Sequence, residues 1–142
     1  MACRLCEIQC IVAHSKSKKI IKAFKEEPLR ALPRLKVYEK GPVSFALQCR
    51  HCEPVDEQGR EAPCIEACLT GAMKRNGKTS AVEHDAEKCV GCWMCIMACP
   101  YGVIIPDTRQ KKVITKCDLC SDEEIPACVK ACPNEALVLE DE

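Results

Sequence analysis

The chain has 142 residues, enough for about one domain, and fifteen of them are cysteine. Only 4% of the residues are aromatic, so a large conventional core is not expected and bound metal would have to take its place. The 21 basic and 21 acidic residues cancel, which gives no overall reason to expect binding to nucleic acid or to an anionic membrane.

The cysteines also indicate a cellular compartment. No export signal opens the chain, and no apolar run approaches the roughly 18 residues that a membrane helix needs. Thiols in such a chain are expected to be metal ligands in a reducing environment, and their odd number argues against complete disulfide pairing. We therefore expect a cytoplasmic protein without direct membrane insertion.

The first feature in chain order is a short cysteine run, Cys3, Cys6 and Cys10, with the spacing C-x2-C-x3-C. Residues 11–27 then show a helical pattern that Pro28 is expected to end. Five lysines of this segment form a basic cluster, at positions 16, 18, 19, 22 and 25. We expect the basic cluster to be a solvated helix face, the alternative being a docking surface for an acidic partner.

A second cysteine run follows a predicted loop at 28–42, which a short strand at 35–38 interrupts. This run has the spacing C-x2-C-x11-C-x3-C and consists of Cys49, Cys52, Cys64 and Cys68. His51 lies between two of these cysteines, and we expect it to form hydrogen bonds or to be exposed, not to bind metal. Two strand-like stretches around Asn76 and Gly77 predict a β-hairpin.

The third run, near the centre of the chain, is the most specific. It has the spacing C-x2-C-x2-C-x3-C-P and consists of Cys89, Cys92, Cys95, Cys99 and Pro100. This is the bacterial-ferredoxin spacing, in which three thiolates surround one iron–sulfur cluster and the fourth ligates the other cluster of a pair. A disulfide knot or a zinc knuckle would not need the fourth cysteine and its proline. The third run therefore indicates [4Fe–4S] clusters. Trp93 lies within this run, and we expect its side chain to pack over the cluster or the interface between modules.

The fourth run follows a second predicted hairpin with its turn at 106–110, and precedes a predicted last strand at 136–139. Its spacing is C-x2-C-x7-C-x3-C-P, formed by Cys117, Cys120, Cys128 and Cys132. Four related runs make an internal repeat, which strengthens the assignment of each. All fifteen cysteines are thus candidate metal ligands.

The first run lacks one cysteine, which would stand immediately before Met1. We expect that the true start lies upstream and that Met1 and Ala2 are spacer residues of a C-x2-C pair. The alternative is a three-cysteine site that holds a [3Fe–4S] cluster, or a labile cubane with an oxygen as its fourth ligand.

Taken together, the motifs resemble a known family. The four runs, with the segments Cys92-Trp-Met-Cys95, Cys99-Pro-Tyr-Gly102, Cys49-Arg-His-Cys52 and Cys117-Asp-Leu-Cys120, resemble four-cluster electron-transfer subunits. Such subunits serve molybdopterin oxidoreductases, formate dehydrogenases, hydrogenases and carbon monoxide dehydrogenase. Residues 6–15 and the short length are most similar to the ferredoxin-like partner of nickel carbon monoxide dehydrogenase, with the related small subunits of formate–hydrogen lyase nearly as similar.

The resemblance implies an α+β fold with short β-hairpins and small helices, in which one bacterial-ferredoxin-like dicluster module is nested within another. A single polyferredoxin domain, 1–142, would contain an outer module of 1–10 plus 117–142 and an inner module of 49–99. Residues 11–48 would be a helical and loop insertion.

The resemblance also implies four [4Fe–4S] clusters whose ligands are exchanged between runs. The implied sets are Cys49, Cys52 and Cys64 with Cys99; Cys89, Cys92 and Cys95 with Cys68; Cys117, Cys120 and Cys128 with Cys10; and Cys3 and Cys6 with Cys132, one ligand being unaccounted for. The sequence departs from the family pattern in that missing cysteine and in Leu69, which stands where a proline often follows the fourth cysteine.

The leading hypothesis is therefore an electron-transfer subunit and not an enzyme, because no catalytic constellation stands apart from the cysteines. Its partners would be a catalytic redox subunit and a second electron acceptor such as a hydrogenase, with membrane association only through a partner. The alternative is a zinc-binding structural or nucleic-acid-binding module, since 117–132 alone could hold zinc. Zero net charge and few aromatic residues argue against nucleic-acid binding. A redox sensor would need an effector domain, for which there is no room.

Overall fold

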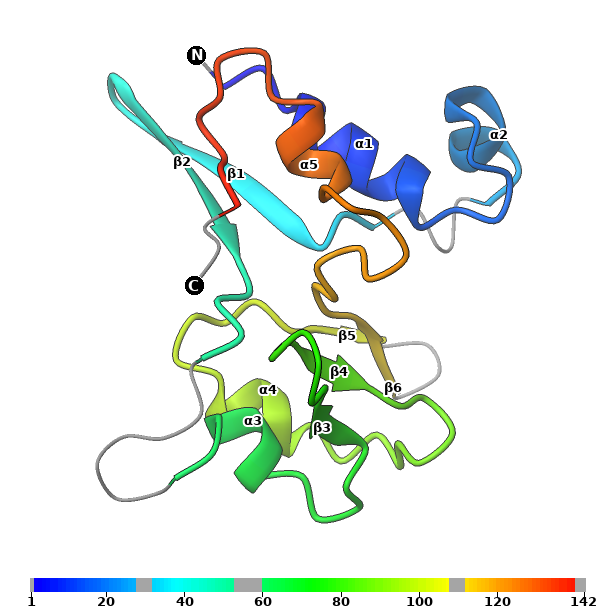
Figure 1. Cartoon of the computed structure of the whole chain (residues 1–142), viewed down its shortest axis with the longest axis vertical. Coiled ribbons are helices and arrows are strands. Elements are labelled where there is room, and N and C mark those ends of the chain that lie inside the picture. The colour runs from blue at the N-terminus through cyan, green and yellow to red at the C-terminus, as the bar shows by residue number, and fades with distance from the viewer. Residues whose placement is uncertain (1, 28–31, 53–59, 108–111, 140–142) are drawn as a thin grey trace. The chain divides into compact units, whose positions relative to one another are not determined.

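A computed structural model describes residues 2–27, 32–52, 60–107 and 112–139 (Figure 1). The chain forms two compact units, the first made of Met1–Leu47 with Leu119–Glu142 and the second of Gln48–Asp118. The two ends of the chain therefore belong to one unit, and its middle forms the other. Within the described ranges, no helix is long and apolar enough to cross a membrane.

The first unit is built around helix α1 (Leu5–Ala13), which packs against helix α5 (Ala127–Lys130) and strand β1 (Leu35–Lys40) (Figure 1). Strand β2 (Val43–Gln48) pairs with β1 in a two-stranded sheet, and the short helix α2 (Ile20–Lys25) contacts α1. The main apolar cluster of this unit has four buried members, Cys6, Cys10, Leu35 and Val37. Half of this small core is cysteine.

The prediction of one continuous helix over residues 11–27 is wrong. Helix α1 starts earlier, and a turn separates it from α2. In this turn the Ser15 hydroxyl donates to the Val12 carbonyl (2.7 Å) and accepts from the Lys18 N–H (3.0 Å). Lys18 has a φ of 52°, which lies outside the helical region. All five lysines of the basic cluster are exposed, as a solvated face requires.

The second unit combines two short helices with two hairpins. Helix α3 (Pro63–Glu66) packs against α4 (Met94–Ala98) and against strand β3. Strand β3 (Met73–Arg75) pairs antiparallel with β4 (Val82–His84), and β5 (Ile105–Asp107) pairs antiparallel with β6 (Lys112–Thr115). Both predicted hairpins are confirmed. The predicted turn at 106–110 lies partly, and Pro28 entirely, outside the described residues.

The core of the second unit is also small. Its buried members are Ala62, Cys64, Met73, Val82, Cys95 and Ile104, and further cysteines pack against them. None of these buried residues is aromatic: they are alanine, cysteine and aliphatic side chains.

The strand predicted at 136–139 is wrong, because these residues have no regular secondary structure. The Ala136 N–H donates to the Cys132 sulfur at 3.2 Å. A backbone donor that a strand would use for pairing thus serves a cysteine instead.

Because the second core is small, single residues in it are expected to matter. Met73 is 2% exposed, and Met73→Ala should lower the free energy of unfolding by about 2–5 kcal/mol. Met97 is 83% exposed, and the control Met97→Ala should change it by about 0.5 kcal/mol or less. Urea unfolding of the anaerobically purified protein measures both, and equal effects of the two variants would contradict the assigned core.

Candidate metal centre

Four cysteines of the second unit line one concave space. Cys49, Cys52, Cys64 and Cys99 surround about 320 Å³, part of it open to solvent. Burial raises the pKa of the Cys64 thiol to about 11, with the charge of Lys116 opposing this rise and the other three thiols adding to it. We call this space the first cavity. Three of its cysteines come from the second run, and Cys99 comes from the third.

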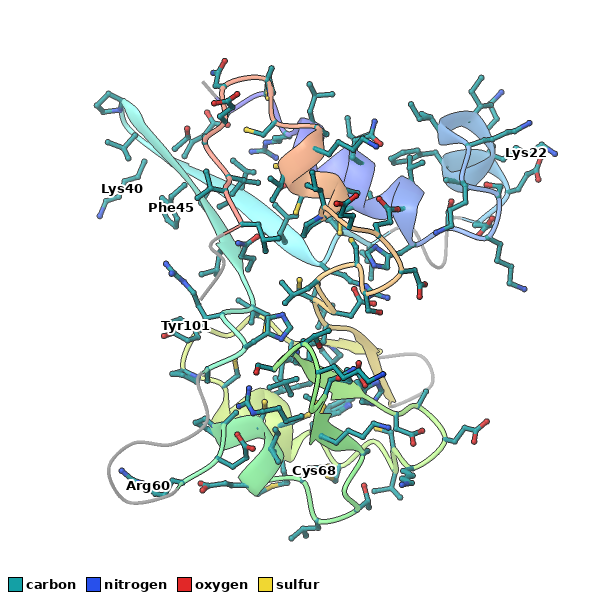
Figure 2. All side chains as sticks on the ribbon, viewed as in Figure 1. Lys22, Lys40, Phe45, Arg60, Cys68 and Tyr101 are labelled. Carbon is teal, nitrogen blue, oxygen red and sulfur yellow. The ribbon has the colours of Figure 1, made fainter. Side chains whose placement is uncertain are left out.

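A second group forms around Cys95, which is buried at the start of α4. Burial raises the pKa of its thiol, and the nearby thiols of Cys68, Cys89 and Cys92 raise it further. Cys68, labelled in Figure 2, comes from the second run, whereas the other three come from the third. The second and third runs therefore each place their fourth cysteine beside the other run.

The first unit gathers cysteines from both ends of the chain. Cys6 is buried, which raises the pKa of its thiol, and Cys132 is one of the charges that act on it. Cys10 and Cys128 belong to the same apolar cluster, while Cys3 is exposed. The expected set of Cys117, Cys120, Cys128 and Cys10 includes residues of both units and stays a prediction.

A repeated turn follows the fourth cysteine of three runs. In each case the cysteine carbonyl accepts a hydrogen bond from the N–H of the residue three positions later. The pairs are Cys68 with Gly71 (3.1 Å), Cys99 with Gly102 (3.2 Å) and Cys132 with Glu135 (3.3 Å). These third residues have φ values of 66°, 59° and 50°. Glycine adopts this left-handed conformation without strain, and Glu135 shows that the turn also forms without it.

The turn brings backbone donors to sulfur. The Met73 N–H lies 3.4 Å from the Cys68 sulfur, and this donor with the Thr70 hydroxyl holds the pKa of Cys68 below its ordinary value although burial raises it. The Leu137 N–H, followed by that of Ala136, likewise lowers the pKa of Cys132. Donors that favour a thiolate suit a metal ligand, because iron binds the deprotonated sulfur.

A second repeated feature lies within the C-x2-C segments. The residue just before the second cysteine has a positive φ in three runs, at His51 (57°), Gly91 (71°) and Leu119 (58°). At the first of these the His51 N–H reaches the Cys49 sulfur at 3.4 Å. Four thiols around one cavity, with backbone N–H groups aimed at sulfur, fit a cubane cluster with four thiolate ligands.

The Arg75 side chain clamps the loop that carries Cys52, a role that no sequence signal indicated. Its guanidinium donates to the carbonyls of His51 (3.3 Å) and Cys52 (2.7 Å). The Glu61 carboxylate accepts from the same guanidinium at 2.5 Å, and this hydrogen bond lowers the pKa of Glu61. The end of β3 is thereby tied to the rim of the first cavity.

His51 is buried and forms hydrogen bonds. Its Nδ1 accepts the Val82 N–H at 2.9 Å and lies 3.5 Å from the Lys116 ammonium. Burial, with the charge of Lys116, lowers the pKa of His51 to about 4, so the ring is neutral with its proton on Nε2. Its Nδ1 lone pair is thus committed to the backbone. Trp93 is partly buried, and it precedes α4 with a φ of 62°.

Comparison with known proteins identifies the class. Residues 42–142 match the family described as a 4Fe-4S dicluster domain. The chain is 36% identical to an iron–sulfur protein of Rhodospirillum rubrum, over 99% of this chain and 77% of that protein. It is 35% identical to the electron transport protein HydN of Escherichia coli (strain K12), over 99% of this chain and 82% of HydN. It is 41% identical to the protein NrfC of the same strain, over 66% of this chain and 40% of NrfC.

These similarities define a ferredoxin-like protein that binds [4Fe–4S] clusters. The chain belongs to the 4Fe-4S dicluster family and serves in electron transfer, not as a catalyst. The resemblance seen in the cysteine runs is confirmed at this level, and the alternative of a zinc or nucleic-acid-binding module is not supported. The small α+β fold with short antiparallel hairpins is compatible with this family.

The Arg75 clamp can be tested directly. Arg75→Ala removes the guanidinium that donates to two loop carbonyls and to the Glu61 carboxylate, which should cost about 1–3 kcal/mol. Iron held in the first cavity should then be lost to a chelator about tenfold faster, as followed by visible absorption. Lys74→Ala, at the exposed neighbouring position of β3, is the control and should match the unaltered protein. Equal rates for both variants would show that the clamp does not hold the loop.

Proposed function

We propose that the chain is an electron relay built from two nested dicluster modules that exchange cysteine ligands. The outer module is 1–10 plus 117–142, the inner module is 49–99, and 11–48 is an insertion within a single polyferredoxin domain. The observation that carries this proposal is the first cavity, which cysteines of two different runs line together. The division of the chain into a unit containing both ends and a unit formed by its middle also supports it.

In this proposal all fifteen cysteines are metal ligands. Cys49, Cys52, Cys64 and Cys99 hold one [4Fe–4S] cluster, and Cys68, Cys89, Cys92 and Cys95 hold a second. Two further clusters depend on the remaining seven cysteines, and Cys132 joins Cys3 and Cys6. The neighbouring thiols that act on Cys64, Cys95 and Cys6 support these groupings.

The clusters supply one-electron exchange, and the chain supplies their placement. The cysteines hold the iron, and the backbone N–H groups beside Cys49, Cys68 and Cys132 stabilise negative charge on sulfur. The buried aliphatic residues around the first cavity, Val82 and Ile104, keep water from its inner wall. No proton transfer is required of any side chain.

The proposed partners are a catalytic redox subunit and a second electron acceptor. The resemblance of residues 6–15 favours a carbon monoxide dehydrogenase as the enzyme, with formate dehydrogenase and hydrogenase as related types, and a hydrogenase as an acceptor. A relative's description as an electron transport protein agrees with such a relay. We propose that the protein acts in the cytoplasm without binding nucleic acid, and reaches a membrane only through a partner.

Ligand exchange has a specific signature in cysteine variants. Cys99→Ser should perturb the same electron paramagnetic resonance signal as Cys64→Ser, because both residues line the first cavity. Cys68→Ser should perturb the same signal as Cys95→Ser. The two pairs serve as controls for each other. If Cys99→Ser instead matched Cys95→Ser, each run would keep its own fourth cysteine and the proposed exchange would be wrong.

Removal of the clusters should unfold the chain, because the cores of both units are small and rich in cysteine. Anaerobic chelation is expected to abolish cooperative thermal melting, as followed by circular dichroism. Iron with sulfide should restore melting and brown colour. Zinc, the control metal, should not restore the visible absorption. Cooperative melting of the iron-free protein near the temperature of the loaded protein would contradict this expectation.

A further inference from the structure

One lysine of the second unit lies inside the protein beside the first cavity. Lys116 is only 6% exposed, and it lines the first cavity together with the four cysteines. Lysine is almost never buried to this extent unless another group compensates its charge. The family assignment and the electron-transfer function leave this residue without a role.

The described hydrogen-bond partners of Lys116 are all neutral. Its ammonium donates to the carbonyls of Val82 (2.5 Å) and Cys117 (3.0 Å), and its third contact is Nδ1 of His51 at 3.5 Å. The His51 ring is neutral because that nitrogen also accepts the Val82 N–H. The two carbonyls orient the ammonium, but neutral acceptors do not cancel its positive charge.

Two other cations lie at or near this cavity. Arg50 lines it but is exposed, so its charge is screened by water. Arg75 also contacts the loop at Cys52, yet its guanidinium is paired with the Glu61 carboxylate at 2.5 Å. The two side chains together carry no net charge. Among the described cations at this cavity, Lys116 is therefore the one that is buried and whose described hydrogen bonds all go to neutral groups.

The sequence repeat provides an internal comparison. Lys88 stands directly before Cys89, as Lys116 stands directly before Cys117, but Lys88 is exposed. A charge in water is screened, whereas a charge inside the protein acts through a lower dielectric. The two cysteine groups of this unit thus differ in their electrostatic surroundings, although their ligands are alike.

Lys116 lines the same space as the four sulfurs, so its charge acts on any negative charge held there. Adding an electron to a cluster in that space increases the negative charge, so a fixed buried cation favours reduction.

We propose that the buried ammonium of Lys116 raises the reduction potential of the cluster held by Cys49, Cys52, Cys64 and Cys99 above that of the other cluster of the same unit. One electron from a donor makes a cluster and its thiolates more negative by one charge, and Lys116 stabilises that added charge. An electron that enters this unit is therefore held by the cluster at the first cavity until an acceptor removes it. This inference rests on the proposed ligand sets.

The test replaces the charge in the full-length, anaerobically purified protein. Lys116→Met and Lys116→Gln should lower the equilibrium constant for reduction of one cluster about tenfold, which is about 59 mV for a one-electron couple. Lys116→Arg keeps the charge and should keep the potential. The matched control is Lys88→Met, which should leave every potential unchanged. Redox titration followed by electron paramagnetic resonance measures the potentials, and iron and sulfide contents report whether each variant is loaded.

The affected cluster is identified by the signal that Cys64→Ser removes. Fully loaded Lys116→Met protein with unchanged potentials would overturn the inference, and so would a shift confined to the signal that Cys95→Ser removes. Should the neutral variants fail to load, the unaltered protein decides, because its Cys64-dependent signal must appear before its Cys95-dependent signal during stepwise reduction. The reverse order would overturn the inference. A colourless unaltered protein without iron and sulfide would instead refute the proposed function.

Discussion

Thiol groups from distant parts of the chain have to converge in a small protein that has little apolar material to hold them together. Cys64 and Cys95 are buried, and burial raises the pKa of both thiols. Without metal, each such group is an unfavourable place for a thiolate. Iron binding removes the protons and joins the chain segments, so the free energy of metal binding becomes free energy of folding. The short helices and hairpins are consistent with this constraint, because they position the cysteines around the metal sites.

Backbone N–H groups, not side chains, supply several of the hydrogen bonds to the cysteine sulfurs. Left-handed residues recur at corresponding positions of the runs, as at His51 and Leu119 within the C-x2-C segments and at Gly71 and Gly102 after the fourth cysteine. Such turns aim N–H groups at sulfur, and the Met73 and Ala136 donors show the result. The same donors that favour thiolate ligands also favour added electrons, so the conformation of the chain and the redox property have one physical origin.

Side-chain charges then distinguish sites whose ligands are alike. Arg75 and Glu61 form a pair that fixes the loop at Cys52, whereas the described hydrogen bonds of Lys116 all go to neutral acceptors. Arg75 thus acts on the position of the ligands, and the charge of Lys116 acts on their electrostatic environment. Unequal potentials of this kind decide at which of two clusters an electron is held.

The sequence by itself determined the class of the protein, because iron–sulfur ligation requires cysteines at spacings that few other sites use. The third run and its repeats predicted [4Fe–4S] clusters, and local turn signals predicted the hairpin at Asn76. The sequence failed where a hydrogen bond to a nonlocal or side-chain partner competes with a repetitive backbone pattern. The helix predicted over 11–27 is interrupted by the Ser15 hydroxyl, and residues 136–139 give a backbone donor to sulfur instead of to a strand.

Only the tertiary structure decided which side chains surround the cysteines. Arg75, Glu61 and Lys116 carry no motif, and in the sequence they look like the other charged residues of a solvated surface. Their roles arise because folding brings β3, β4 and the segment before Cys117 against one cavity. Local spacing specifies a ligand, since ligands of one run are neighbours in the chain. The electric field at a cluster depends on charged residues that are distant in the chain. Local sequence spacing therefore does not predict it.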